Sequence, residues 1–254
     1  MCGRFTHHYT WQELYTLLRL TSGTPLVPAE IAPRFNVAPT QHTPVVTESL
    51  DGQRSAGNEH NAHGQRAAGA ERTARTMRWG LVPSWASDPV IGSRLINARS
   101  EEASTKPSFR AACKQRRCLV PISEFYEWET VPHQRTKQPW AFRVTTAPLC
   151  ALAGLWEHWH KPDTGLPALE TFTILTCAPN ALLGRFHDRM PCIVPPQQYD
   201  AWLDPNQHDW SALKHILQPF PAEQMEATRV STRVNSPRND DPTLIQPVEG
   251  GTLF

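Results

Sequence analysis

The sequence contains no apolar run long enough to cross a bilayer, which takes about 20 consecutive apolar residues in a helix. Its first residues, M-C-G-R-F-T-H-H, also lack the apolar core of a secretory signal peptide. We therefore expect a cytoplasmic protein, or a nuclear one if its source is eukaryotic, with no membrane partner. In either compartment the six cysteines are expected to be mostly reduced thiols.

Closely spaced metal ligands are scarce as well. Cys113 and Cys118 have four residues between them, and no second close pair completes a tetrahedral set. The histidines at 7–8 and those at 158 and 160 are isolated, which is typical of surface or packing residues. The sequence thus indicates no metal site and no organic cofactor.

Charged residues make up only 19% of the chain and hydrophobic residues 39%, while prolines number 24 against 13 glycines. This composition favours a fold rich in strands and loops over a helical bundle. The net charge of +1 hides an asymmetry, because residues 1–120 hold 15 Lys+Arg and 9 Asp+Glu. Thirteen of those 15 cations are arginines, whose planar donors suit phosphate, although asymmetry alone is a weak indication of nucleic-acid binding.

Local patterns predict short helices and many strands. Thr10 and Glu13 match a capping box and predict a helix over 11–20. Helical spacing recurs at 101–114, 197–203 and 210–217, the last with Asp209 as N-cap. Six apolar, β-rich runs lie between residues 77 and 178, and residues 130–139 are typical of a hairpin connection.

Residues 51–75 contain no Val, Ile, Leu, Met or aromatic residue, so burial cannot offset the entropy of ordering them. We interpret them as a flexible loop inserted between two strands, and residues 248–254 as a C-terminal tail. At 254 residues the chain can bury one sizeable core. The expected fold is a single α+β domain over residues 1–254 with an antiparallel, barrel-like core flanked by short helices.

Four polar clusters interrupt the apolar runs. Each one has an ordinary structural explanation: Asn97 could cap a helix, Glu127 could pair with an arginine, and His187 could lie in a surface loop. Taken together, they supply a nucleophile, a carboxylic acid, a histidine, an amide and arginines, which is the composition of a covalent site acting near nucleic acid. The clusters are Cys2-Gly3-Arg4, Asn97-Ala98-Arg99-Ser100-Glu101, Glu124-Phe125-Tyr126-Glu127-Trp128 and His187-Asp188-Arg189-Met190-Pro191.

Six motifs occur in the order found in the SRAP (SOS response-associated peptidase) family, and the chain resembles that family over nearly its whole length. The stretches at 234–236 and 244–247 resemble the family's C-terminal strands. Any one motif is weakly specific, but six in order are strongly so. The motifs are M-C-G-R-F at 1–5, R-F-N-V-A-P at 34–39, W-G-L-V-P-S-W at 79–85, I-N-A-R-S-E at 96–101, F-Y-E-W at 125–128 and H-D-R-M-P at 187–191.

The resemblance implies a sensor of abasic sites in single-stranded DNA that forms a covalent cross-link through its N-terminal cysteine. Cys2 would be that residue once Met1 is removed, because a terminal cysteine carries an α-amine and a thiol on adjacent carbons. By the same resemblance Glu127 would transfer protons during sugar ring opening and Schiff-base formation. His187 would shuttle protons on the Schiff base and in cross-link reversal, and Asn97 would hold the terminus or the sugar.

The resemblance also implies a DNA-binding set. Arg99 and Arg189 would contact phosphates that flank the lesion, and Arg4 or Arg78 could add to them. Trp79 and Pro39 would offer a stacking or wedge surface, although core packing explains Trp79 about as well. We expect a monomer.

Two other functions stay open at this point. Cys2, Glu127 and His187 could serve a thiol peptidase or autopeptidase, although only Met1 precedes Cys2 and no longer pro-segment is expected. Alternatively, the arginines and aromatic residues could form a non-covalent reader of single-stranded DNA. The sequence does not decide whether lyase activity or cross-link reversal accompanies cross-linking.

Overall fold

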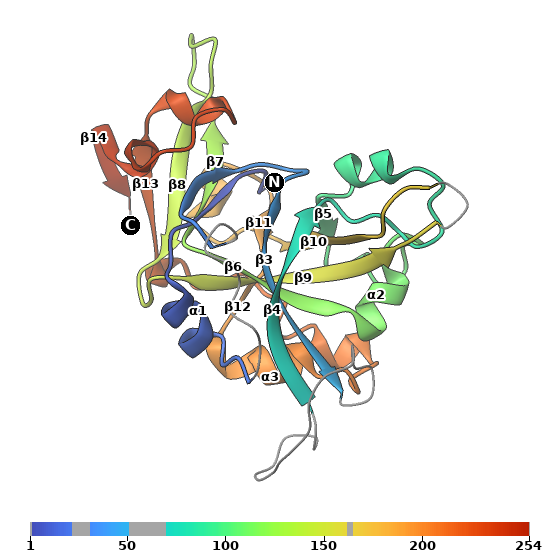
Figure 1. Ribbon diagram of the computed structural model, residues 1–254. Coiled ribbons are helices and arrows are strands. Elements are labelled where there is room, and N and C mark those ends of the chain that lie inside the picture. The colour runs from blue at the N-terminus through green and yellow to red at the C-terminus, as the bar shows by residue number, and fades with distance from the viewer. Residues whose placement is uncertain (1, 22–30, 51–69, 162–164, 254) are drawn as a thin grey trace.

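Two curved β-sheets form most of the molecule in the computed structural model, which describes residues 2–21, 31–50, 70–161 and 165–253 (Figure 1). In the larger sheet, β10 pairs with β4 at one side and with β9 at the other, which closes five strands into a barrel. The five strands are β3 (His42–Leu50), β4 (Ala70–Trp79), β6 (Arg117–Ile122), β9 (Cys150–Trp159) and β10 (Leu169–Cys177). This architecture confirms the expected α+β fold with a barrel-like antiparallel core.

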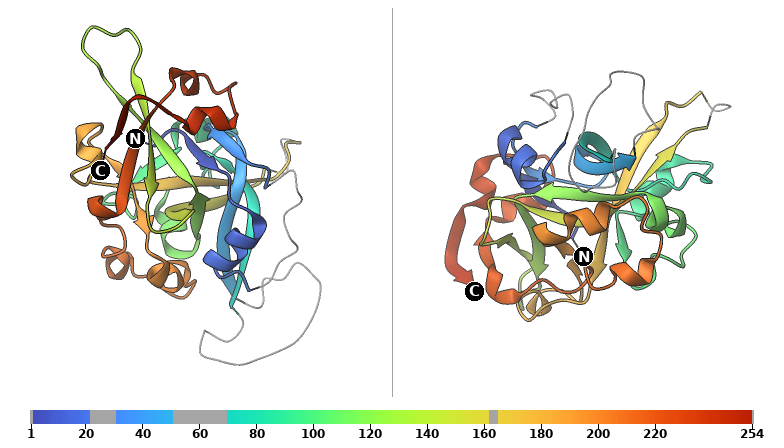
Figure 2. Two further views of the ribbon diagram at one scale, coloured as in Figure 1. Left: turned by 90° about the vertical axis from the view of Figure 1, so that its left-hand side faces the viewer. Right: turned by 90° about the horizontal axis from the view of Figure 1, so that it is seen from below.

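Three short strands extend the barrel. β5 (Asn97–Arg99) runs parallel to β10, and β11 (Met190–Pro191) and β12 (Ile193–Val194) pair with β10 and β9. The second sheet packs beside the barrel and has the strand order β14-β13-β8-β7-β1-β2 (Figure 2). Its strands are β1 (Phe5–His7), β2 (Arg34–Val37), β7 (Glu124–Glu129), β8 (Gln138–Val144), β13 (Met225–Val230) and β14 (Pro247–Leu253).

The predicted hairpin at 130–139 is confirmed, because β7 and β8 pair on either side of residues 130–137. The hairpin projects from the body of the molecule in Figure 1 and in the left view of Figure 2. The predicted tail at 248–254 is wrong through Leu253. That segment forms β14 and pairs with β13, which places Leu253 opposite Ala227.

The predicted loop at 51–75 is wrong for its last six residues, and residues 51–69 lie outside the described part of the chain. Residues 70–75 begin β4 and pair with β3. They add little apolar surface, but Arg72 is fully buried and donates to Glu48 at 2.6 and 2.9 Å and to Asp200 at 2.7 Å. Ladder hydrogen bonds and this buried ion pair order the segment, and neither leaves a signal in apolar content.

The helices are shorter than their sequence patterns suggest. α1 (Trp11–Leu17) has the predicted capping box, with Thr10 as N-cap, and ends before Arg19, whose φ is +54°. α2 (Arg110–Gln115) covers only the end of the helix expected at 101–114, because residues 101–108 form turns. α3 (Tyr199–Leu203) covers the last five residues of the helix expected at 197–203. The last predicted helix is reduced to a 3₁₀ turn at Trp210–Leu213, capped by Asp209.

No helix in the described residues is long and apolar enough to span a membrane. Further 3₁₀ turns connect the strands. The turns are Pro89–Arg94, Leu183–Arg185, Pro196–Gln198, Ala222–Gln224, Thr232–Asn235 and Pro242–Ile245.

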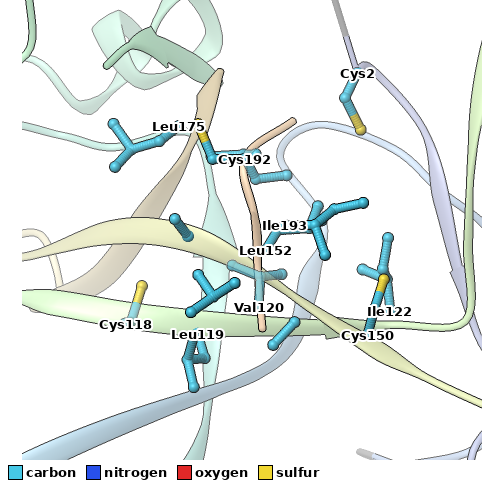
Figure 3. Close-up of a cluster of buried hydrophobic side chains, with 14 of the residues drawn as sticks. Cys2, Cys118, Leu119, Val120, Ile122, Cys150, Leu152, Leu175, Cys192 and Ile193 are labelled. Atoms are coloured by element: carbon cyan, nitrogen blue, oxygen red, sulfur yellow. The ribbon is translucent and has the colours of Figure 1, made fainter. Parts of the chain in front are cut away.

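One large hydrophobic cluster joins the barrel to the second sheet. Phe5 packs on Trp79 with ring centroids 5.0 Å apart, and Phe125 stacks on Phe142 at 5.3 Å. The side chain of Cys2 belongs to this cluster and is fully buried (Figure 3). The fold therefore anchors the start of the chain in its core instead of leaving it frayed.

Candidate active site

Pairing of β1 with β7 fixes the start of the chain. Phe5 pairs with Phe125, and just beyond this pair the amide of Tyr126 donates to the carbonyl oxygen of Arg4 at 3.0 Å. From β5, Nδ2 of Asn97 donates to the carbonyl oxygen of Cys2 at 2.8 Å. Cys2 is thus held from both sides, by the second sheet through Arg4 and by the barrel through Asn97.

The Cys2 thiol is buried among apolar side chains and lies near the negatively charged carboxylate of Glu127. Figure 3 shows its sulfur directed into the buried cluster that contains Ile122, Cys150 and Ile193. Burial raises the pKa of the Cys2 thiol far above its usual range, and the nearby carboxylate of Glu127 raises it further. At neutral pH the sulfur is therefore a neutral thiol that needs a base if it is to react.

Glu127 supplies a group that can gain or lose a proton near pH 7. It lies on β7 opposite Trp140 of β8, and it is only 3% exposed. Burial raises its pKa to about 7, and the positive amino terminus of the chain opposes that rise. A carboxyl group that is about half protonated at neutral pH is suited to general acid–base catalysis.

Asn97 does not cap a helix, as its position after Leu95-Ile96 also allowed. It is the first residue of β5, opposite Ile174 of β10. While its amide nitrogen holds Cys2, its Oδ1 atom is buried and has no hydrogen-bond partner among the described residues. A buried acceptor of this kind can accept a hydrogen bond from a donor group of a bound substrate.

His187 lies after β10 and the 3₁₀ turn at 183–185, and its amide donates to the carbonyl of Leu183 at 3.0 Å. Its Nδ1 atom lies 2.7 Å from Oδ1 of Asp188 and accepts from the amide of Arg189 at 3.0 Å. Burial is the largest cause that lowers the pKa of His187, and Asp188 opposes it. The ring is therefore held in place and titrates below its usual range.

These contacts bring together the four residues predicted to be catalytic. Asn97 contacts Cys2 directly, and Glu127 is close enough to shift the pKa of the Cys2 thiol. Lys137 and Asp188 each act electrostatically on both Glu127 and His187. Segments from residue 2 to residue 187 thus meet at one site.

A groove of about 580 Å³ opens beside this site, at the base of the β7–β8 hairpin. Pro39 lies on it, as a wedge residue would. Trp128 and Lys137 line the same groove, although neither was among the DNA-binding residues predicted from the sequence. The lining residues are Gly3, Arg4, Pro39, Trp128, Thr136, Lys137 and Asn235.

Arg4 is partly committed to the protein itself. Its Nη1 atom donates to Oδ1 of Asn36 at 2.8 Å and to the carbonyl of Val234 at 2.9 Å. Its guanidinium carbon lies 6.0 Å from the ring centroid of Trp128. Arg4 therefore shapes one wall of the groove, and Trp128 forms a neighbouring wall.

The other predicted DNA-binding arginines differ in accessibility. Arg99 is exposed, whereas Arg78 is half-buried and its Nη1 atom has no partner among the described residues. Arg189 is almost fully buried and donates to both oxygens of Glu101, at 2.9 and 2.7 Å. It also donates to the carbonyl of Thr176. The guanidinium of Arg189 thus links β10 to the turn after β5. The predicted phosphate contact of Arg189 is replaced in the structure by this contact within the protein.

The predicted stacking role of Trp79 is also wrong, and the alternative of core packing holds. It is fully buried, its Nε1 atom donates to the carbonyl of Ile96 at 2.8 Å, and its ring stacks on Phe172. It offers no surface to a nucleobase. Trp128 is the aromatic residue on the groove, and its place in the F-Y-E-W motif beside Glu127 is the signal that could have identified it.

Known proteins are similar to this chain over most of its length. The chain is 39% identical over 246 residues to the abasic site processing protein YoqW of Bacillus subtilis, an alignment that covers 97% of this chain and 99% of YoqW. It is 30% identical over 245 residues to the abasic site processing protein HMCES of Gallus gallus, covering 86% and 67% of the two chains.

A crystal structure of a Bacteroides thetaiotaomicron protein shares the fold, with a TM-score of 0.75 and 24% identity, over 96% of this chain and 99% of that one. The family model for SOS response associated peptidase (SRAP) matches residues 1–237, which include Cys2, Asn97, Glu127 and His187. The chain belongs to the SRAP family.

Proposed function

We propose that the protein recognises abasic sites in single-stranded DNA and, once Met1 is removed, binds them covalently through Cys2. Relatives that align over nearly the whole chain are named abasic site processing proteins, which supports the choice of substrate. The observation that carries the proposal is the environment of the terminus. A buried cysteine at position 2 is held by Asn97 and lies beside a carboxyl group whose pKa is about 7.

The reaction follows from the functional groups. The ring-opened form of an abasic sugar is an aldehyde, and the α-amine of Cys2 adds to it and then loses water to give a Schiff base. The thiol sulfur of Cys2 next bonds to the imine carbon, and the thiol proton ends on the nitrogen. The product is a five-membered thiazolidine ring, which neither serine nor alanine can form at this position.

Each of these steps requires the transfer of a proton at neutral pH. With an α-amine pKa of about 7.7–8.0, roughly a tenth to a sixth of the amine is neutral at pH 7. The thiol is also protonated, because burial raises its pKa. Glu127 can accept a proton from the amine or the thiol and donate one to the departing water, since both of its protonation states are populated near pH 7.

The surroundings fit a strand of DNA that continues past the sugar. The groove beside Cys2 is lined by Trp128 and Pro39, on which a flanking base can stack, and Lys137 adds a cation at its rim. Arg99, which is exposed on β5, adds a cation on the barrel side of the site. We assign phosphate contacts to these two cations, and stacking to Trp128 and Pro39.

The test is a denaturing gel of the protein incubated with a single-stranded oligonucleotide that carries one abasic site. The wild type should give a shifted band, Cys2→Ala should give none, and an intact oligonucleotide should give none with either protein. Cys150→Ala is the matched control, since Cys150 belongs to the same buried cluster but has no adjoining amine. A wild type without a shifted band would overturn the proposal.

The same preparation separates the alternatives. Turnover of casein or a peptide that survives excess DNA would favour a thiol peptidase, and reversible binding independent of the lesion would favour a non-covalent reader. The protonated, buried thiol of Cys2 is unlike the thiolate that a thiol peptidase uses, so we do not expect peptide turnover.

A further inference from the structure

Asp188 and Lys137 carry opposite charges beside the two groups that exchange protons at the site. The side chain of Asp188 is 77% exposed, yet its Oδ1 atom lies 2.7 Å from Nδ1 of His187. Lys137 is exposed at the base of the β7–β8 hairpin and lines the groove beside Arg4 and Trp128. Asp188 has no place in the reaction described above, and Lys137 was assigned only a contact to a DNA phosphate.

The contacts of His187 distinguish its two protonation states. The amide N–H of Arg189 donates to Nδ1 at 3.0 Å, which requires that nitrogen to be unprotonated. The carboxylate of Asp188 at 2.7 Å from the same nitrogen is favourable only when Nδ1 carries a proton. The neutral ring is therefore held by the Arg189 amide and the imidazolium by Asp188, while Nε2 has no hydrogen-bond partner among the described residues.

We infer that Asp188 is a positioning residue that holds the imidazolium of His187 through Nδ1, leaving the Nε2 proton for transfer, and that Lys137 opposes it. This inference rests on the proposed function for its role in cross-linking. Its electrostatic part stands without DNA, because it concerns only how the charge of the ring depends on two surface side chains.

The charges that face the two proton-exchanging groups support this arrangement. Around His187, burial is the largest cause that lowers its pKa. The amino terminus, Lys137 and Arg189 lower it too, and Asp188 raises it. Around Glu127, burial raises the pKa, the amino terminus and Lys137 lower it, and Asp188 raises it. Asp188 thus favours the protonated form of both groups, and Lys137 disfavours it.

The two substitutions should therefore act in opposite directions. Asp188→Asn should move the titration of His187 and the nearest limb of the cross-linking pH profile to lower pH, by about half a unit for a partly exposed pair. Lys137→Gln should move both to higher pH by a smaller amount, and Asp188→Glu should restore the wild-type profile. Lys114→Gln removes a charge from an exposed position of α2 and serves as the control, which should leave both pH profiles unchanged.

The experiment has two independent readouts on the full chain. NMR titration of ¹⁵N-labelled histidine follows His187 without DNA, with the signal assigned by its loss in His187→Gln. The rate of cross-linking to an abasic oligonucleotide between pH 5 and 9 follows the reaction. Opposite shifts for Asp188→Asn and Lys137→Gln in both readouts support the inference.

Unchanged titration of His187 in Asp188→Asn would overturn the inference, as would shifts of the same sign in the two variants. A wild type that forms no cross-link would instead defeat the proposed function, and the NMR titration would still decide the electrostatic part. A loss of cross-linking in Asp188→Asn with an unshifted pH profile would indicate a merely structural residue and would also overturn it.

Discussion

Replacing Glu127 by Gln should make the protein less sensitive to pH while it slows the reaction. The pKa of Glu127 rises from an ordinary value of 4.5 to about 7 in the folded protein. The folded state therefore binds this proton more tightly than the unfolded state, and stability is lost as pH rises from about 4.5 to 7. The difference of about 2.5 units corresponds to about 3 kcal/mol of lost stability above pH 7.

Glu127→Gln removes that charge, so it should remove most of this loss. Urea denaturation at pH 5 and at pH 8 measures it as the difference between two unfolding free energies. Because part of this loss occurs below pH 5, the wild type should lose about 2–3 kcal/mol more between these pH values than Glu127→Gln does. The comparison across pH is more informative than either value alone, because the buried amide of Gln has its own desolvation cost.

The same substitution should slow cross-linking by about 10²–10⁴-fold, the usual contribution of a positioned general acid–base. Glu124→Gln is the matched control. Burial also raises the pKa of Glu124 to about 7, but its side chain lines a different pocket, with His8 and Arg143. This control should also reduce the pH dependence of stability, and it should cross-link at the wild-type rate.

Two results would refute this reasoning. If Glu127→Gln cross-links as fast as the wild type, the carboxyl group does not transfer protons in the rate-limiting step. If its stability falls between pH 5 and pH 8 as steeply as that of the wild type, Glu127 is not a buried group with a raised pKa.

Three further predictions concern residues around the site. Trp79→Ala should lower the free energy of unfolding in urea by about 3–5 kcal/mol, because the ring is core; normal stability with weakened DNA binding would instead return Trp79 to the DNA surface. Asn97→Ala removes the 2.8 Å hydrogen bond to Cys2 and should slow cross-linking about tenfold without changing DNA affinity; an unchanged rate in single-turnover gels would contradict this. Arg99→Gln should reduce the slope of log affinity against log salt by about one, and an equal slope would exclude a phosphate contact.

Sequence patterns brought out the polar residues of the candidate site because each lies in a short motif next to apolar residues, and the resemblance to the SRAP family supplied their expected roles. The alternation of a strand places Glu127 on the same face as Phe125, and both side chains are buried in the structure. The capping box of Thr10 and Glu13 likewise needs only four adjacent residues. Each of these signals lies within one helix or strand and does not depend on the segments that pack against it.

What the sequence could not predict depends on contacts between distant segments. The start of β4 is ordered by β3 and by the ion pairs of Arg72 with Glu48 and Asp200, and none of these is adjacent to it in sequence. Arg189 resembles a phosphate ligand until Glu101, 88 residues away, is found on its guanidinium. The sequence around Lys137 is typical of a hairpin connection and does not indicate a binding site. Only the fold brings Lys137 to the groove.

The central claim is that the reacting group is the amine and thiol of Cys2 at a free amino end. Mass spectrometry of the digested cross-link tests it most directly. Met1 should be absent, and the remnant of the abasic sugar should be attached to the peptide that begins at Cys2, with the mass of a condensation that has lost one water. An adduct on an internal residue, or a cross-linked protein that retains Met1, would contradict it.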